Sequence, residues 1–282
     1  MKVQWHFQMN QNNDSTTLMS FWHVIVCMLL FFCVLLLCIG CENDEKPAGK
    51  VNGYVVAIDQ ILSQNKVAVA SATLIGDNGW LVAHKHFHGQ PEMSDAMTKP
   101  VYLEEGTTQN VFLELKSHVS VSDGDSLWVM LHEDTGKGGV FEFGQGKRDL
   151  PVKTLGDFAA NPIRIKSPVI IATDQPVSQN RIRIDQIVSG TDGWVVVYIE
   201  DGSQSLGLSV GHTRISEGKE KDVPVSLLDT VDYEKGMELH LRLHLDKGKF
   251  GKYEYPGPDV PEIFGNSGNN EIITSIALES NS

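Results

Sequence analysis

Cysteine is nearly confined to the start of the chain. The sequence has 282 residues and four cysteines, and none of them follows Cys41. All four lie in or at the end of one hydrophobic segment. Residues 42–282 therefore hold no disulfide and no thiolate metal site. Catalysis by a cysteine nucleophile is excluded there as well.

Positive charge is also scarce. Lysine and arginine number 23 against 36 aspartates and glutamates, which gives a net charge of −13 with neutral histidine and a pI near 5.1. A surface this acidic repels the phosphate backbone of nucleic acids. We therefore expect no nucleic-acid partner.

Several signatures of catalysis are missing. The sequence contains no phosphate-binding loop and no His-Glu-x-x-His zinc motif. Carboxylates are numerous, but an acidic chain offers pairs of them by chance, so they do not indicate a glycosidase. We expect a protein that is not an enzyme.

One long hydrophobic run lies near the N-terminus. It covers residues 21–39, FWHVIVCMLLFFCVLLLCI, and the polar residues 42–46 follow it. Its length is close to the roughly 20 residues that span a bilayer, so length alone does not separate a cleaved signal from a retained transmembrane anchor. The start codon is also open between Met1 and Met19. In either case we expect the rest of the chain to be exported and tethered.

The end of this run resembles the lipobox of bacterial lipoproteins, in which a small residue precedes a cysteine that is lipidated and becomes the new N-terminus. Gly40 and Cys41 fit this pattern, whereas Cys38 stands where leucine is usual. The resemblance implies lipidation at Cys41 and a location outside the cytoplasm, at the cell surface or on the periplasmic face of a bacterial membrane. Several acyl chains would hold the protein there, since each buried methylene contributes about 0.8 kcal/mol.

The remainder of the chain contains an internal repeat. Residues 57–65 and 172–180, offset by 115, are identical at six of nine positions. Further matches follow in the same order: Gly79-Trp80 with Gly193-Trp194, Glu105-Gly106 with Glu217-Gly218, residues 131–134 with 243–246, and 141–143 with 253–255. Two homologous domains therefore stand in tandem. We assign residues 1–40 to the leader, 41–53 to the lipidated cysteine and a tether, 54–158 to the first repeat and 168–279 to the second, with a connector at 159–167.

Each repeat has the pattern of short β-strands. Residues 65–75 and 180–188 are rich in β-branched residues at alternate positions, and residues 239–245 alternate leucine with polar residues. Asp-Gly and Asn-Gly pairs mark the turns. The expected fold is all-β: two tandem antiparallel β-sandwich domains of immunoglobulin-like or cupredoxin-like type after the hydrophobic leader. A small barrel is the alternative.

At these residues the chain resembles an uncharacterised domain family of prokaryotic secreted and surface proteins, often found in tandem. The shared pattern is an Asp-Gln opening, a strand beginning Gly-Trp, a His-x-Asp ending, a glycine turn and two aromatics. Here the openings are Asp59-Gln60 and Asp174-Gln175, and the strands begin at Gly79 and Gly193. The resemblance implies an extracellular β-domain and no agreed biochemical activity.

A histidine cluster is the feature most suggestive of chemistry. His84, His86 and His88 alternate along one expected strand, and the two-residue period puts them on one face. With His132 from a neighbouring strand they could bind copper or zinc. In the second repeat His84 aligns with Tyr198 and His86 with Glu200, so such a metal site would belong to the first repeat alone. The interpretation that we favour at this point is an exposed strand end with incidental histidines.

A hairpin motif is shared by the two repeats, and its role is unknown. Its polar members are His132, Asp134 and Glu142 in the first repeat and His244, Asp246 and Glu254 in the second. These side chains could converge on a cation such as calcium. Lysine in both turns opposes a cation, so we favour a structural hairpin in which the aspartate caps the turn and the aromatics pack beneath it.

Together these features favour a membrane-anchored lipoprotein whose tandem β-sandwich domains serve a non-catalytic binding or structural role. Its partners would be the membrane and an unidentified protein or carbohydrate ligand. The alternative is a copper- or zinc-binding lipoprotein that uses His84, His86, His88 and His132.

Overall fold

The computed structural model describes residues 45–46, 51–144, 146, 148–200, 206–265 and 270–280. The hydrophobic run at 21–39 and the expected lipidation site at Cys41 lie outside them. Among the described residues, no helix has the length and apolar character needed to cross a membrane. Residues Glu45–Ser282 form one compact unit.

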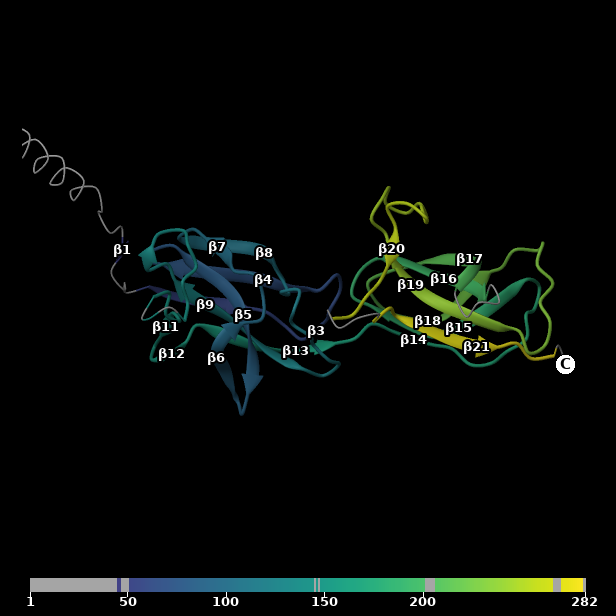
Figure 1. The fold of residues 1–282 in the computed structure, drawn as a ribbon, viewed down its shortest axis with the longest axis horizontal. Helices are drawn as coiled ribbons and strands as arrows, with labels where there is room; N and C mark the ends of the chain where they lie inside the picture. The colour runs from purple at the N-terminus through teal and green to yellow at the C-terminus, as the bar shows by residue number, and fades with distance from the viewer. Residues whose placement is uncertain are drawn as a thin grey trace, which may run out of the picture. The chain divides into compact units, whose positions relative to one another are not determined.

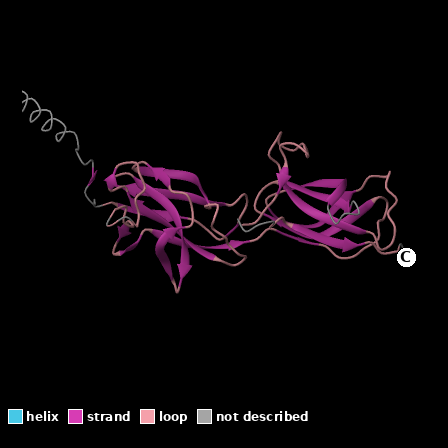
Figure 2. Cartoon of the chain, viewed as in Figure 1, coloured by secondary structure: helices cyan, strands magenta, loops and turns pink. Residues whose placement is uncertain are grey.

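The described chain consists of strands and loops (Figures 1 and 2). Strands of the first half are β1 Glu45–Lys46, β2 Asn52–Val56, β3 Gln60–Ile61, β4 Lys66–Ile75, β5 Gly79–Phe87, β6 Gln90–Ala96, β7 Val101–Leu103, β8 Gly106–Glu114, β9 Ser126–Glu133, β10 Gly136–Lys137, β11 Lys153–Thr154, β12 Asp157–Phe158 and β13 Ala160–Lys166. Strands of the second half are β14 Val169–Ile171, β15 Arg181–Ser189, β16 Gly193–Glu200, β17 Leu206–Ile215, β18 Gly218–Ser226, β19 Glu238–Leu245, β20 Val260–Pro261 and β21 Ile273–Ala277. The all-β expectation is confirmed.

Each repeat is a sandwich of two sheets. In the first, strands β2-β4-β8 form one sheet, and the other has the order β3-β13-β9-β5-β6 with β7 beside β5. In the second, β14-β15-β18 face β17-β16-β19-β20, with β21 beside β19. Neighbouring strands are antiparallel apart from the β3–β13 pair, which is parallel. The two-residue period of strands such as β4 turns every second side chain into the space between the sheets.

Each sandwich has its own hydrophobic core. In the first repeat, side chains such as Val67 on β4 and Leu131 on β9 belong to one buried cluster. In the second, Ile184 on β15 and Leu241 on β19 belong to another. The central strands β5 and β16 are buried on both faces over most of their length. A second buried layer therefore exists on the outer face of the β5–β9 and β16–β19 pairs, and it contains the candidate site.

The glycines that open β5 and β16 allow close approach of the neighbouring strand. A Cβ atom on Gly79 would overlap the carbonyl oxygen of His132, and one on Gly193 would overlap that of His244. The Gly-Trp motif is therefore a packing requirement. It brings β5 against the part of β9 that carries His132.

The expected connector at residues 159–167 is wrong. Strand β13 pairs with β9, with Ile163 opposite Leu127, and its isoleucines Ile163 and Ile165 are buried in the first core. The connector was placed in the gap between the two sets of repeat matches. The alternation of the two isoleucines was the stronger signal, because it is the period of a half-buried strand.

The segment that follows the second hairpin, residues 256–265, alternates between exposed positions and positions buried against the first repeat. Phe264 is buried within the core cluster of the first repeat. The Glu262 carboxylate accepts hydrogen bonds from Ser63 Oγ at 3.2 Å and from the Gln64 amide at 3.1 Å. Burial raises the pKa of Glu262 to about 7, so the carboxyl group changes its protonation state near neutral pH.

This contact predicts a pH-dependent stability. Because the folded pKa of Glu262 is about 7 against an ordinary 4.5, the folded state binds a proton more tightly than the unfolded state. The stabilisation that this proton gives to the folded state is fully present below pH 4.5, and it is lost as the pH rises through about 7. Glu262→Gln should therefore stabilise the protein relative to wild type above pH 7, by about 3 kcal/mol at most. Urea unfolding of the detergent-solubilised chain at several pH values measures this difference.

The exposed Glu279 provides the control, since Glu279→Gln should leave the pH profile unchanged. Identical profiles for wild type and Glu262→Gln would show that the carboxyl group gains no proton on folding.

Candidate functional site

The candidate site lies on the outer face of the β5–β9 pair. The register places Trp80 opposite His132, Val82 opposite Met130, and His84 opposite Trp128. Side chains that alternate with these, such as Leu81 and Leu131, enter the core between the sheets. Each such pair of opposite residues forms one row across the two strands. The two histidines are thus on different strands, one in the row before and one in the row after the Val82–Met130 row.

His84 and His132 point toward each other across this row. Their Nε2 atoms are 3.1 Å apart, and the rings are stacked with 24° between their planes. Both side chains are fully buried. The structure therefore brings together two of the four histidines that the sequence proposed as metal ligands.

The remaining ring nitrogens fix the protonation of the pair. His84 Nδ1 lies 3.0 Å from the carbonyl oxygen of Glu92, and His132 Nδ1 lies 2.7 Å from that of Asp149. A carbonyl oxygen only accepts, so each Nδ1 must carry the hydrogen and donate it. In a neutral imidazole the Nε2 atom then has a bare lone pair. Two such lone pairs face each other and require a shared proton or metal ion.

Burial disfavours a proton shared between the two Nε2 atoms, because it disfavours the charged form of each ring. Desolvation lowers the pKa of His84, and it lowers the pKa of His132 to about 3. A metal ion fits the same geometry, because histidine nitrogens bind zinc at about 2.0 Å, and two of them at a tetrahedral angle are roughly 3.3 Å apart. The observed Nε2–Nε2 separation of 3.1 Å is close to that value.

Aromatic rings cover the pair. Phe143 packs edge-on against His132 with ring centroids 4.5 Å apart and against His84 at 5.4 Å. Phe141 contacts His132 and also Trp80. These are the two aromatics of the shared hairpin motif, and here they exclude water from the histidine nitrogens.

Met130 shares the outer face with the two histidines, in the row between theirs. It is fully buried, and it faces away from the core that holds its neighbours Val129 and Leu131. Its row separates the row of His132 from the row of His84. The register thus puts a methionine and two histidines on one buried face, and all three side chains are neutral.

The second repeat has the same frame and different chemistry. Tyr198 occupies the place of His84, and its hydroxyl lies 3.0 Å from His244 Nε2. Arg242 occupies the place of Met130 and donates to His244 Nε2 at 3.2 Å and to the Tyr198 hydroxyl at 3.3 Å. The Arg242 contacts show that a side chain at this position reaches the space between the pair. With donors already on Nε2 and a fixed positive charge, this site has no place for a metal cation.

The other two proposed ligands lie elsewhere. A register shift separates His84 from His86, and Trp128 donates its indole N–H to His86 Nδ1 at 2.9 Å. His88 is exposed in the following turn with a φ of 49°. His86 therefore lies on the outer face with Trp128 and away from the pair. The expectation that the three histidines share one face is wrong for His88, because the strand ends before it.

The carboxylates of the hairpin motif are occupied by backbone amides. Asp134 accepts from the Gly139 N–H at 3.0 Å, and Glu142 accepts from the Lys137 N–H at 2.9 Å. Their counterparts do the same: Asp246 accepts from Gly251 and Glu254 from Lys249. This arrangement is that of a capped turn.

Sequence analysis did not identify a third turn carboxylate. Asp149 Oδ1 accepts from the Thr135 amide at 2.8 Å, and its Oδ2 accepts from the Glu142 amide. Asp259 occupies the same place in the second repeat, where it accepts from Lys247 and Glu254. The signal was available, since Asp149 and Asp259 each begin an Asp-aliphatic-Pro triplet.

Residues 207–211, GLSVG, match Gly-x-Ser-x-Gly, the nucleophile motif of one hydrolase class. That motif requires a sharp turn between a strand and a helix. Ser209 instead lies within the continuous strand β17, opposite Tyr198 of β16, so the pattern lacks its structural context.

Comparison with known families gave one match. The model of a domain of unknown function (DUF7282) matches residues 53–165 and again residues 168–270. No curated protein matches the chain.

Two solved structures show a distant likeness. The FN1-FN3 domains of chicken CNTN1 are 9% identical, with a TM-score of 0.24 over 81% of this chain and 67% of that one. The alpha-2-macroglobulin of E. coli in its native conformation is 12% identical, with a TM-score of 0.25 over 85% of this chain. The matched region spans only 17% of the macroglobulin.

The buried turn carboxylate gives a testable prediction. Asp149→Asn replaces one acceptor oxygen by an amide that faces a backbone N–H, so one buried amide loses its partner. We expect the free energy of unfolding to fall by about 1–3 kcal/mol, as measured by urea unfolding. Asp157→Asn, at an exposed strand position, should have no effect. Equal losses in the two variants would contradict the capping role.

Proposed function

The chain belongs to the DUF7282 family, with two copies of the domain in tandem, and we propose that it is an extracytoplasmic, membrane-tethered protein whose first repeat binds copper(I) without catalysis. The observation that carries the proposal is the His84–His132 pair. Two buried, bare imidazole nitrogens at 3.1 Å are arranged as two ligands of one ion.

The donor set favours copper(I) over zinc. Imidazole suits both metals, whereas thioether sulfur selects copper(I). Structural zinc sites almost always have four protein ligands, and among the described residues no further histidine, cysteine, aspartate or glutamate joins this pair within coordinating distance. Two nitrogens and the Met130 sulfur give a three-coordinate site.

Charge favours the same ion. His84, His132 and Met130 are all neutral, and they are fully buried beneath Phe141 and Phe143. A monovalent ion leaves one uncompensated charge in this dry environment, and a divalent ion would leave two. Because the cost of burying charge rises steeply with its size, copper(I) is the better occupant.

The sequence supports a location outside the cytoplasm, where the protein would encounter copper. The run at 21–39 and the Gly40-Cys41 pair resemble a lipoprotein signal, and the acidic chain that follows has no cysteine to compete for copper or to oxidise. Lipidation at Cys41 would keep the protein on the membrane while the binding domain extends into the exterior medium.

Replacing His84 tests the function. His84→Tyr copies the residue of the second repeat and removes one of two imidazole ligands, so affinity for copper(I) should fall at least about 100-fold, or by about 2.7 kcal/mol. Anaerobic competition with a chromophoric copper(I) chelator, on protein purified from membranes, measures the affinity. Any cysteine in the preparation is common to both proteins, so the difference reports the histidine site.

Tyr198→Phe, at the equivalent position of the second repeat, is the matched control and should bind copper(I) as wild type does. Equal affinity of wild type and His84→Tyr would reject copper binding at this pair. The tandem domains would then be left with the surface-binding or spacer role expected from the sequence.

Replacing Met130 tests the choice of ion. Met130→Leu keeps the volume and removes the sulfur, so copper(I) affinity should fall about tenfold, or by about 1.4 kcal/mol, with little loss of stability. X-ray absorption at the copper edge should show one sulfur neighbour in wild type and only nitrogen neighbours in the variant. Wild-type protein with no sulfur neighbour would show that the two histidines bind the metal without Met130.

A further inference from the structure

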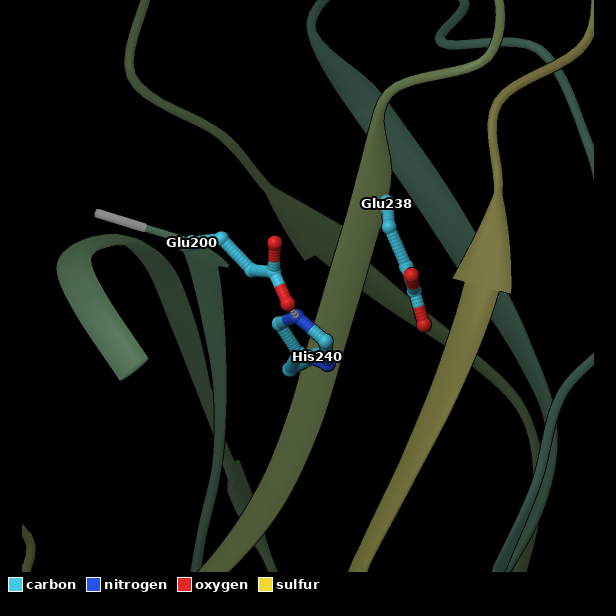
Figure 3. A group of neighbouring side chains, drawn as sticks. All are labelled: Glu200, Glu238 and His240. Carbon is cyan, nitrogen blue, oxygen red and sulfur yellow. Dashed lines mark ion pairs between the residues drawn. The ribbon is translucent and has the colours of Figure 1, made fainter. Parts of the chain in front are cut away.

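A second group of metal-ligating side chains lies in the second repeat, where the sequence gave no motif. Glu200 ends β16, and Glu238 and His240 lie at the start of β19 (Figure 3). One ligand atom of each lies within 4.8 Å of the others. Among the described residues, this is where three such ligands converge.

The strand register creates this convergence. Tyr198 pairs with His240 and Ile199 with Leu239, so the next residues, Glu200 and Glu238, are opposite each other at the end of the ladder. Side chains at 200, 238 and 240 therefore share one face. Two carboxylates in directly opposite positions repel each other unless a cation lies between them.

The histidine is oriented toward the carboxylates. His240 is buried, and its Nδ1 lies 2.7 Å from Ser275 Oγ on β21. Its Nε2 has no access to solvent and no hydrogen-bond partner, and it lies 3.7 Å from Glu200 Oε1. A histidine whose second nitrogen is held in this way is typical of a metal ligand. Figure 3 shows Nε2 directed at the Glu200 carboxylate.

We propose that Glu200, Glu238 and His240 form a zinc site, with water completing the coordination on the exposed side of the carboxylates. Zinc binds imidazole nitrogen and carboxylate oxygen, and with three protein ligands it keeps a fourth position for water. Calcium and magnesium prefer oxygen ligands alone, so the imidazole disfavours both. The two negative charges distinguish this site from the neutral ligands of the first repeat, and they match a divalent ion.

The site is specific to the second repeat. His86, Ser126 and Trp128 occupy the corresponding places in the first, and the indole of Trp128 already donates to His86. Each repeat therefore has its own candidate site where the other has none. The zinc proposal does not depend on copper binding.

Zinc titration of the full chain tests the proposal, with the His84→Tyr substitution present throughout so that the first-repeat site is removed. Isothermal titration calorimetry with zinc alone should show one saturable equivalent. Adding Glu200→Gln, which is nearly isosteric and partly exposed, should weaken zinc binding at least about tenfold. Glu234→Gln, an exposed turn residue nearby, is the control and should change nothing.

Thermal unfolding provides a second measurement that does not rely on a variant. Zinc should raise the Tm in the His84→Tyr background, and calcium at the same concentration should not. The proposal is overturned if zinc binding does not saturate, if Glu200→Gln and Glu238→Gln bind as their parent does, or if calcium replaces zinc. Copper affinity is measured separately, so failure of either site leaves the other identifiable.

Discussion

Two backbone carbonyl groups determine the chemistry of the first repeat. Glu92 and Asp149 accept the Nδ1 hydrogens of His84 and His132, and this leaves both Nε2 atoms bare at 3.1 Å from each other. Both histidines are fully buried, so neither nitrogen is exposed to bulk solvent as a substitute partner. A proton is disfavoured there by burial, which lowers the pKa of both rings. The hydrogen-bonding frame thus leaves the pair incomplete until a cation is bound.

The duplication supplies a comparison within one molecule. Both repeats place the histidine of the strand before the hairpin, β9 or β19, against two aromatics of that hairpin, and both hold the hairpin with three carboxylates. At the central positions, however, Arg242 and Tyr198 complete the hydrogen bonds of His244, whereas Met130 and His84 leave His132 with a bare Nε2. Residues shared between the repeats build the turn and the packing. Residues that differ determine whether the layer can accept a metal ion.

The fold could be predicted from the sequence further than the site could. Alternation along β4 and β15 and the internal repeat indicated tandem sandwiches, because a two-residue period has one simple structural meaning. The site depends on which strands are neighbours and in what register, and that information is not local. His84 and His132 are 48 positions apart. The even spacing of the three histidines suggested one shared site, but Trp128 holds His86 and β5 ends before His88.

Met130 and His240 also could not be identified as site residues from the sequence. A methionine within a buried apolar strand has the pattern of a core residue, and only the register with β5 shows that it faces the outer layer beside two histidines. His240 alternates with leucines and has the pattern of a surface residue, yet β21 covers it and leaves its Nε2 without a hydrogen-bond partner. In both cases the neighbouring strands, and not the local sequence, determine which groups surround the side chain. A search for metal sites in other members of this family should therefore begin at the positions equivalent to 84, 130, 200, 238 and 240, where the two repeats of this chain differ, and not at the motif residues that they share.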